Sequence, residues 1–270
     1  MTKSTVDDRW WSVVPNFFTL LNLIFGCIAI VLILQTNETI VMLQDGGASQ
    51  VVLPERIWWG ALLIFGAGII DFADGFLARL LNASTGMGRQ LDSLSDIVSF
   101  GVAPGMILYQ LLRIGYAQHE NGLDISVVAL LPAFIYTGAV AWRLAKFNLS
   151  TDQDTNFKGV PSPAAALFVA SFPLIILYQY FNLQTLFINP WVLYMIIILL
   201  VFLMLSNWSF MAIKFKNYSF KNNALKYILI FAAIVFVVIL KWLAVPAIFL
   251  LYLMVSFFSK ETDSEHLSGK

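Results

Sequence analysis

Four aspartates in one short stretch are the residues with the most evident chemistry. Asp71 and Asp74 are three residues apart, and Asp92 and Asp96 are four apart. On helices, each pair would project from a single face. The segment between the pairs is rich in Gly, Ser and Asn, which favours a reversal of the chain. Two antiparallel helices would then point four carboxylates at one another.

Strongly apolar segments flank this cluster on both sides, so its negative charges need compensation. Unpaired acids in a membrane span are costly, and no set of intramembrane Lys or Arg is large enough to neutralise them. Carboxylate oxygens favour Mg²⁺, Mn²⁺ or Ca²⁺ over softer metals. Four carboxylates on facing helices could hold two such ions, and two-metal sites typically bind phosphate oxygens.

The composition indicates an integral membrane protein. The chain has 270 residues, is 59% hydrophobic and 12% charged, and has a mean hydropathy of +0.80, whereas soluble domains are about 25% charged. Neither histidine lies in an apolar run, which argues against a histidine metal site or a nucleophile triad. Cys27, the only cysteine, is expected to be a buried small side chain. We expect no nucleic-acid partner.

Hydropathy predicts an all-α protein with about eight transmembrane helices. The expected spans are residues 17–34, 57–81, 91–115, 125–147, 162–181, 190–206, 224–240 and 242–259. Residues 1–16 would form an N-terminal interfacial segment, 17–259 one transmembrane domain, and 260–270 a disordered cytoplasmic tail. Lys241 is expected to mark a tight turn between the last two spans.

The distribution of basic residues predicts the orientation. With the N-terminus in the cytoplasm, thirteen of the sixteen Lys and Arg residues fall at the inner face. The outer face receives only Arg56, Arg113 and Lys241, which is a strong positive-inside bias. Both termini would then be cytoplasmic, and the aspartates would face cytoplasmic nucleotides and inner-leaflet lipid. Because no organelle address is evident, we expect the plasma (inner) membrane of a prokaryote.

Small residues accompany the first aspartate pair. Gly75 and Ala78 share a helical face with Asp71 and Asp74, and their small size would leave space for a ligand. The alternative is that they only permit close helix packing. Arg79 could pair with a phosphate or extend to the membrane interface.

The aspartates belong to a longer pattern that resembles the signature of the CDP-alcohol phosphatidyltransferase family. The pattern is D-x-x-D-G-x-x-A-R, eight residues, then G-x-x-x-D-x-x-x-D, and every fixed position is filled. These positions are Asp71, Asp74, Gly75, Ala78, Arg79, Gly88, Asp92 and Asp96. The resemblance implies the family's helical bundle. It also implies that all four aspartates bind two divalent cations, Mg²⁺ or Mn²⁺, that hold the pyrophosphate of a CDP-linked lipid.

The resemblance also implies individual roles. Asp96 would be ligand and base for the acceptor hydroxyl, and Gly75, Ala78, Arg79 and Gly88 would line the CDP pocket. A homodimer is expected as well. A carboxylate near two dications is biased toward ionisation and is a weak base, but Asp96, one turn beyond Asp92, is best placed to reach past the metals.

Flanking segments resemble the bacterial and archaeal phosphatidylserine synthase branch of that family. They are PNFFTLLNLIFG (15–26), LDSLSDIVSFGVAPG (91–105), RLAKFN (143–148) and FKGVPSPAAA (157–166). This implies CDP-diacylglycerol as donor and L-serine as acceptor. The candidate residues for serine or lipid phosphate are Arg143, Lys146, Asn148, Lys158 and Ser162. The alternative is that these cations serve only topology and anionic headgroups.

Polar residues also mark the cytoplasmic end of the first span. Thr19 and Asn22 follow Asn16 at offsets of three and six, and Thr19 and Asn22 are candidates for contact with the nucleotide. Asn16 could instead cap the helix.

Other functions remain open at this point. The same reaction could use glycerol 3-phosphate or inositol phosphate as acceptor. A cation-coupled transporter could use the acids as a relay, although transporters often show two related halves and here the acids fall in one hairpin. A metal-stapled structural hairpin would leave the spacing of the glycines unexplained.

Overall fold

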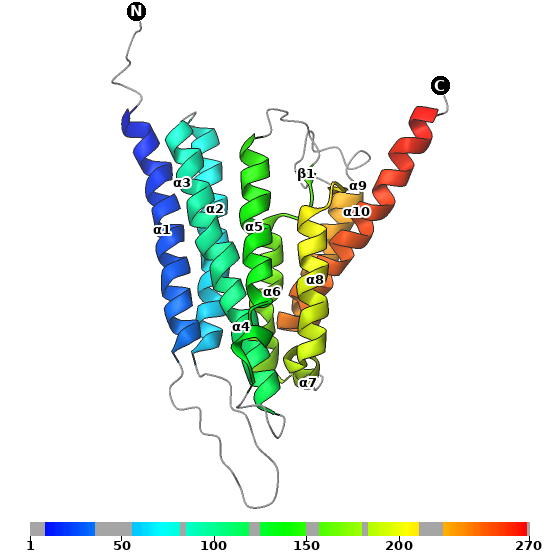
Figure 1. Ribbon diagram of the computed structural model, residues 1–270. Coiled ribbons are helices and arrows are strands. Elements are labelled where there is room, and N and C mark those ends of the chain that lie inside the picture. Colours follow the sequence, from blue (N-terminus) through cyan, green and yellow to red (C-terminus); the bar gives the residue numbers. More distant parts are fainter. Residues whose placement is uncertain are drawn as a thin grey trace, which may run out of the picture.

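The computed structural model describes residues 9–35, 56–81, 85–118, 125–149, 157–179, 183–210 and 224–268. These residues form a bundle of helices that run alternately up and down, and the start of α1 and the end of α10 lie at the same end (Figure 1). The main helices are α1 (Arg9–Leu34), α2 (Ile57–Leu80), α3 (Gly86–Asp96), α4 (Ala103–Ala117), α5 (Ala133–Leu149), α6 (Ser162–Tyr178), α8 (Pro190–Leu205), α9 (Ala224–Leu240) and α10 (Ala244–Ser268). The shorter helical elements of the described residues are α7 (Gln184–Ile188), two 3₁₀ turns (Val127–Ala129 and Lys241–Leu243) and a π-helical segment (Ile97–Val102).

Local sequence signals explain where several helices begin and end. Thr85 precedes α3 and its hydroxyl accepts a hydrogen bond from the Gly88 N–H. Asn189 caps α8 by accepting from two backbone N–H groups, and Pro190 occupies the first helical position, where its missing N–H is not needed. Lys241 has a φ of 51° in the turn between α9 and α10. The tight turn predicted there is confirmed.

A π-helical segment, Ile97–Val102, connects α3 to α4. Pro104 has no N–H to donate to the carbonyl of Phe100, four residues earlier. The hydroxyl of Tyr136 on α5 donates to that carbonyl at 3.0 Å, and the Thr137 hydroxyl donates to the next carbonyl, that of Gly101, at 3.0 Å. Because the segment follows Asp96 directly, it joins the end of α3 that carries the aspartates to the core of the bundle.

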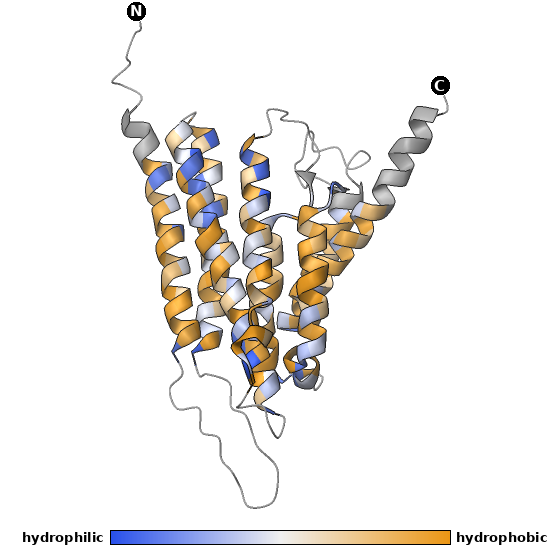
Figure 2. Ribbon diagram, viewed as in Figure 1, coloured by the Kyte–Doolittle hydropathy of each residue, from blue (hydrophilic) through white to orange (hydrophobic). Residues whose placement is uncertain are grey.

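Within the described residues, four stretches are long and apolar enough to cross a membrane. They are Val14–Leu34, Ile57–Leu80, Gly86–Ala117 and Tyr227–Phe257, the last of which includes the turn at Lys241. The helices α6 and α8 are apolar but shorter. Most of the helical surface is hydrophobic, and hydrophilic turns gather near the upper ends of α1, α2, α3 and α5 (Figure 2).

The structure differs from the sequence-based expectations in three places. The backbone of α10 continues to Ser268, so residues 260–268 are helical where a disordered tail was expected. Helix α1 begins at Arg9, so Asn16 lies inside the helix and does not cap it, and residues 1–8 of the predicted interfacial segment lie outside the described part. Cys27 is exposed on α1, because its side chain faces away from the bundle, and the expectation of burial was wrong.

The all-α prediction holds apart from one short ladder. The two-residue strands β1 (Phe157–Lys158) and β2 (Ser209–Phe210) pair antiparallel. Just after β1, Gly159 has a φ of +78°, and a Cβ there would lie 2.3 Å from the Met204 carbonyl oxygen. Only glycine suits this position. The ladder and this close approach attach the segment before α6 to the end of α8.

Candidate metal and phosphate site

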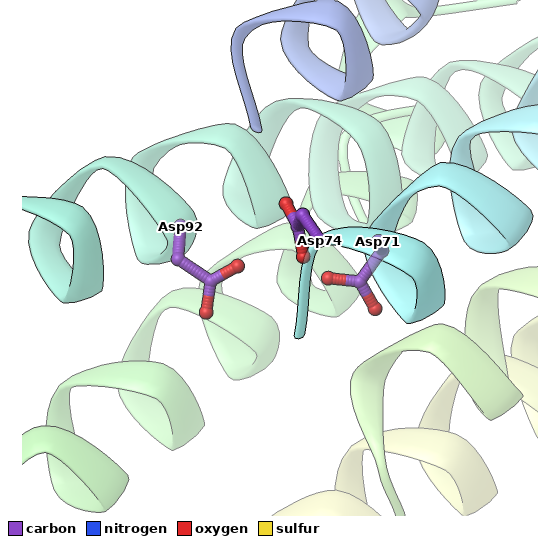
Figure 3. A group of neighbouring side chains, drawn as sticks. All are labelled: Asp71, Asp74 and Asp92. Atoms are coloured by element: carbon purple, nitrogen blue, oxygen red, sulfur yellow. The ribbon is translucent and has the colours of Figure 1, made fainter. Parts of the chain in front are cut away.

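Three of the four aspartates meet where α2 and α3 face each other. Asp71, Asp74 and Asp92 each offer a carboxylate oxygen, and these oxygens all lie within 4.8 Å of one another. Figure 3 shows the carboxylates of Asp71 and Asp92 pointing toward each other, with Asp74 between them. The predicted antiparallel pairing of the two aspartate pairs is therefore present in the structure.

The acidic face of α2 points into the bundle, and its apolar face points outward. Asp74 is 4% exposed, whereas Phe72 and Phe76 are 70% and 52% exposed. Intramembrane acids are expected to face the interior of a bundle or a polar cavity. Acidic side chains on the inside and large apolar side chains on the outside are the arrangement expected for a helix that contacts lipid.

Two side chains of α1 donate hydrogen bonds to the aspartates. The Thr19 hydroxyl donates to Asp74 Oδ2 at 2.8 Å, and the Asn22 amide donates to Asp96 Oδ1 at 3.4 Å. Both donor residues are buried. Thr19 and Asn22, predicted as nucleotide contacts, thus hold two of the four carboxylates in this structure.

Two serines that the sequence analysis did not single out attach α1 to α3 and to the π-helical segment. Ser95 donates to the Thr19 carbonyl and Ser99 to the Asn22 carbonyl, both at 2.9 Å. Each bond anchors the backbone of a residue whose side chain supports an aspartate. The available signal was two small polar residues spaced four apart in line with Asp92 and Asp96.

Asp96 is the last residue of α3, one turn beyond Asp92. It is 7% exposed, lies within hydrogen-bonding range of Asp71, and is close enough to Asp92 and Asp74 to interact electrostatically with both. The group that gathers within 4.8 Å does not include it. Asp96 therefore borders the three-carboxylate cluster on its interior side.

Arg143 on α5 lies across from Asp96. Its guanidinium interacts electrostatically with the Asp96 carboxylate, and its Nη1 donates to Ser162 Oγ at 3.2 Å. Among the described residues, the buried Nε of Arg143 has no hydrogen-bond partner. Arg143 and Ser162, both predicted for the acceptor or a lipid phosphate, are thus brought together beside Asp96.

The remaining predicted residues of the acceptor region lie nearer the surface. Asn148 donates to the Ser93 hydroxyl at 2.8 Å, beside Asp92 in the sequence. Lys146 donates to Asn207 Oδ1 at 2.8 Å and therefore contacts the chain just after α8. The side chain of Lys158 lies outside the described part of the structure.

The predicted nucleotide pocket combines open and crowded positions. A Cβ added at Gly75 would meet no heavy atom within 4 Å, whereas at Gly88 it would lie 2.9 Å from Asn16 Oδ1. Gly75 therefore leaves free space beside the aspartates, and Gly88 permits the close approach of α1. Ala78 is half-buried, and Arg79 is exposed in the last turn of α2.

This donor set fits a divalent cation of the hard class. It consists of the carboxylate oxygens of Asp71, Asp74 and Asp92 from two helices, with Asp74 supported by a hydrogen bond from α1. Such ligands suit Mg²⁺, Mn²⁺ or Ca²⁺. The free space at Gly75 lies on α2, the helix that carries Asp71 and Asp74.

The sequence matches the family described as CDP-alcohol phosphatidyltransferase over residues 12–202. The chain belongs to the CDP-alcohol phosphatidyltransferase family. The resemblance seen in the spacing of the aspartates and glycines is thereby confirmed. With its long apolar helices, this CDP-alcohol phosphatidyltransferase family member is an integral membrane protein.

Several named proteins resemble this family member. A Helicobacter pylori protein named CDP-diacylglycerol–serine O-phosphatidyltransferase is 35% identical over 196 residues, which are 70% of this chain and 76% of the relative. A Bacillus subtilis protein of the same name is 36% identical over 116 residues, 43% of this chain and 60% of the relative. An archaetidylserine synthase from Methanothermobacter thermautotrophicus is 34% identical over 117 residues, 42% of this chain and 45% of the relative.

Proposed function

We propose that this protein transfers the phosphatidyl group from CDP-diacylglycerol to the hydroxyl of L-serine, giving phosphatidylserine and CMP. The observation that carries the proposal is the convergence of three carboxylates from α2 and α3 within 4.8 Å, in a chain 35% identical to a protein named for this reaction. The names of the relatives favour serine over glycerol 3-phosphate or inositol phosphate as acceptor.

Asp71, Asp74 and Asp92, with Asp96 at the inner edge, would hold two divalent cations, Mg²⁺ or Mn²⁺. Such ions, when bound, neutralise phosphate charge at the reacting centre. Thr19 keeps the Asp74 carboxylate oriented through its 2.8 Å hydrogen bond. Hydrogen bonds of this kind orient metal ligands and raise the affinity of the site for the metal.

Asp96 is the residue we assign as base. The serine oxygen forms a bond to the phosphorus of the phosphatidyl group, the bond from that phosphorus to the CMP oxygen breaks, and the proton of the serine hydroxyl passes to the Asp96 carboxylate. Asn22 donates to one oxygen of Asp96, which orients the carboxylate. Reactions of this class depend mainly on positioning and charge neutralisation.

The substrates would occupy opposite sides of the aspartate cluster. The space at Gly75, together with Ala78, Arg79 and Gly88, would receive the CDP group. The half-buried Arg143 and the buried Ser162, which are hydrogen-bonded to each other, supply polar groups near Asp96, where an acceptor must place its hydroxyl. An arginine can bind a carboxylate through two parallel hydrogen bonds, which suits the carboxylate of serine.

We also propose the placement of the protein in the membrane. The chain would cross the plasma (inner) membrane of a prokaryote eight times, with both termini and the aspartates on the cytoplasmic side. The continuous pair α3 and α4 would form one span, and the other seven would be α1, α2, α5, α6, α8, α9 and α10. The positive-inside bias supports this orientation. The functional unit would be a homodimer.

The acceptor assignment can be tested with the purified full-length protein in vesicles. With CDP-diacylglycerol and Mg²⁺ or Mn²⁺, we expect serine-dependent release of CMP and formation of labelled phosphatidylserine. Glycerol 3-phosphate and inositol phosphate, offered separately, should not release CMP. Consumption of either one without consumption of serine would show that the acceptor is wrong.

The role of Asp96 needs a separate comparison of turnover and nucleotide binding. Asp96→Asn should reduce turnover far more than it weakens binding of CDP-diacylglycerol, because the amide cannot accept the proton. Asp92→Asn, the matched substitution one turn earlier, should weaken both. If Asp96→Asn lowered turnover and binding of CDP-diacylglycerol to the same extent as Asp92→Asn does, Asp96 would be a metal ligand rather than the base.

A further inference from the structure

Helix α10 carries polar side chains that the matched family region does not include. That region ends at residue 202, and Tyr252 and Ser256 lie well beyond it. Both are buried, with exposures of 8% and 2%. They are four residues apart and so occupy one face of the helix, where the hydroxyls of Tyr252 and Ser256 are hydrogen-bonded to each other.

The ring of Tyr252 rests on the segment that leads to Ser162. It stacks on Phe210 of β2, with ring centroids 6.2 Å apart and planes at 25°. β2 pairs with β1, and Val160, two residues after β1, donates its N–H to the Leu203 carbonyl at 3.1 Å. Tyr252 therefore borders the structure that holds the start of α6 in place.

Tyr252 lies close enough to Arg143 for the two side chains to interact electrostatically, and the same guanidinium interacts with Asp96. A guanidinium has five N–H groups; one Nη donates to Ser162, and Nε is buried without a partner among the described residues. A half-buried arginine with a buried, unused donor is suited to bind an anionic group.

We propose that Tyr252 is a positioning residue of an anion-binding site centred on Arg143. Its hydroxyl holds the guanidinium so that the unused N–H groups face an anionic group of a substrate, and Ser256 holds the hydroxyl in turn. This inference rests on the proposed function. The anionic group is either the carboxylate of the acceptor or the phosphate of the CDP-linked lipid, since both match a guanidinium.

The test is the variant Tyr252→Phe, which keeps the ring on Phe210 and removes only the hydroxyl. Michaelis constants for serine and for CDP-diacylglycerol are measured separately, with kcat. We expect the KM for serine to rise about tenfold with a small change in kcat, as for loss of one hydrogen bond to a charged group. A rise confined to CDP-diacylglycerol also supports the site and identifies the lipid phosphate as its anion.

Two outcomes would overturn the inference. One is that both KM values stay within about twofold of the wild type, a change too small for the loss of such a bond. The other is that both rise together with a lower unfolding midpoint, which indicates a packing role. Tyr109→Phe is the matched control, because Tyr109 is a part-buried tyrosine of α4 whose ring packs on Phe134, and it should leave both KM values unchanged.

A binding measurement separates this inference from the proposed function. If the anion is the acceptor carboxylate, serine should raise the unfolding midpoint of the wild type, ethanolamine, which lacks the carboxylate, should not, and Tyr252→Phe should lose the serine effect; if it is the lipid phosphate, Tyr252→Phe should keep the serine effect and lose the stabilisation by CDP-diacylglycerol. Ser256→Ala should reduce the same ligand-induced stabilisation that Tyr252→Phe loses. It serves as the second variant if Tyr252→Phe does not fold. If the wild type makes no phosphatidylserine, the proposed function fails, and the KM for CDP-diacylglycerol, measured with the acceptor it does use, decides the role of Tyr252.

Discussion

The hydrogen bond from Tyr136 to the Phe100 carbonyl allows a quantitative prediction. Both residues are fully buried, and the usual helical donor to this carbonyl is absent because residue 104 is proline. Tyr136→Phe removes the 3.0 Å bond with little change in shape. It leaves a buried carbonyl without its side-chain donor at the junction between α3 and α4.

The magnitude follows from the setting of the bond. Interhelical hydrogen bonds in membrane proteins average about 0.6 kcal/mol and reach about 1.7, while an unpaired buried acceptor costs about 1–3 kcal/mol. Because Pro104 cannot replace the lost donor, we expect a loss of roughly 1–2 kcal/mol. For a chain of this size that lowers the unfolding midpoint by roughly 2–8 °C.

The assay is thermal unfolding of the purified protein in detergent, with turnover measured on the same samples. Tyr109→Phe is the control, and it should unfold at the wild-type temperature. Because the π segment follows Asp96 directly, Tyr136→Phe should also reduce kcat. If Tyr136→Phe and Tyr109→Phe unfold at the same temperature, our account of the π segment is wrong.

Three further predictions concern the support and charge of the aspartates. Gly26→Ala should lower both stability and turnover, because its Cβ would lie 2.9 Å from the backbone Cα of Ser99; unchanged unfolding would contradict the close packing of α1 on the π segment. Thr19→Val should raise the metal concentration needed for half-maximal thermal stabilisation by about tenfold or more, since the bond to Asp74 is lost; an unchanged titration would refute that support. Exhaustive chelation should abolish turnover and lower the unfolding midpoint, and added Mg²⁺ or Mn²⁺ should restore both; full turnover after chelation would exclude the metal site.

Much of the fold and the centre of the site could be predicted from local patterns. The helices lie close to the stretches that hydropathy marked, because apolar runs of this length are stable in lipid only with their backbone bonds satisfied within a helix. Three of the four aspartates predicted to meet do so, because offsets of three and four residues define a helical face. The tail after Lys260 was read as disordered from its polarity, whereas its backbone continues α10 to Ser268.

The contacts between helices could not be predicted, because they depend on how each helix is rotated and packed. Thr19 and Asn22 were identified as polar residues near the site, but only the structure shows that they donate to Asp74 and Asp96. Arg143 and Ser162 are nineteen residues apart, and only the packed structure shows that they are hydrogen-bonded to each other.

The sequence by itself determined the chemistry: a membrane-embedded pair of helices with facing carboxylates, in the register of a phosphatidyltransferase family. Those features are encoded in residue type and short spacing, which a helix converts directly into geometry. Only the tertiary structure decided which side chains support that chemistry, including the hydroxyls of Tyr136 and Tyr252. Tyr136 is 36 residues from Phe100, whose carbonyl it contacts, and Tyr252 is more than thirty residues from Arg143. No local sequence pattern predicts contacts over such separations.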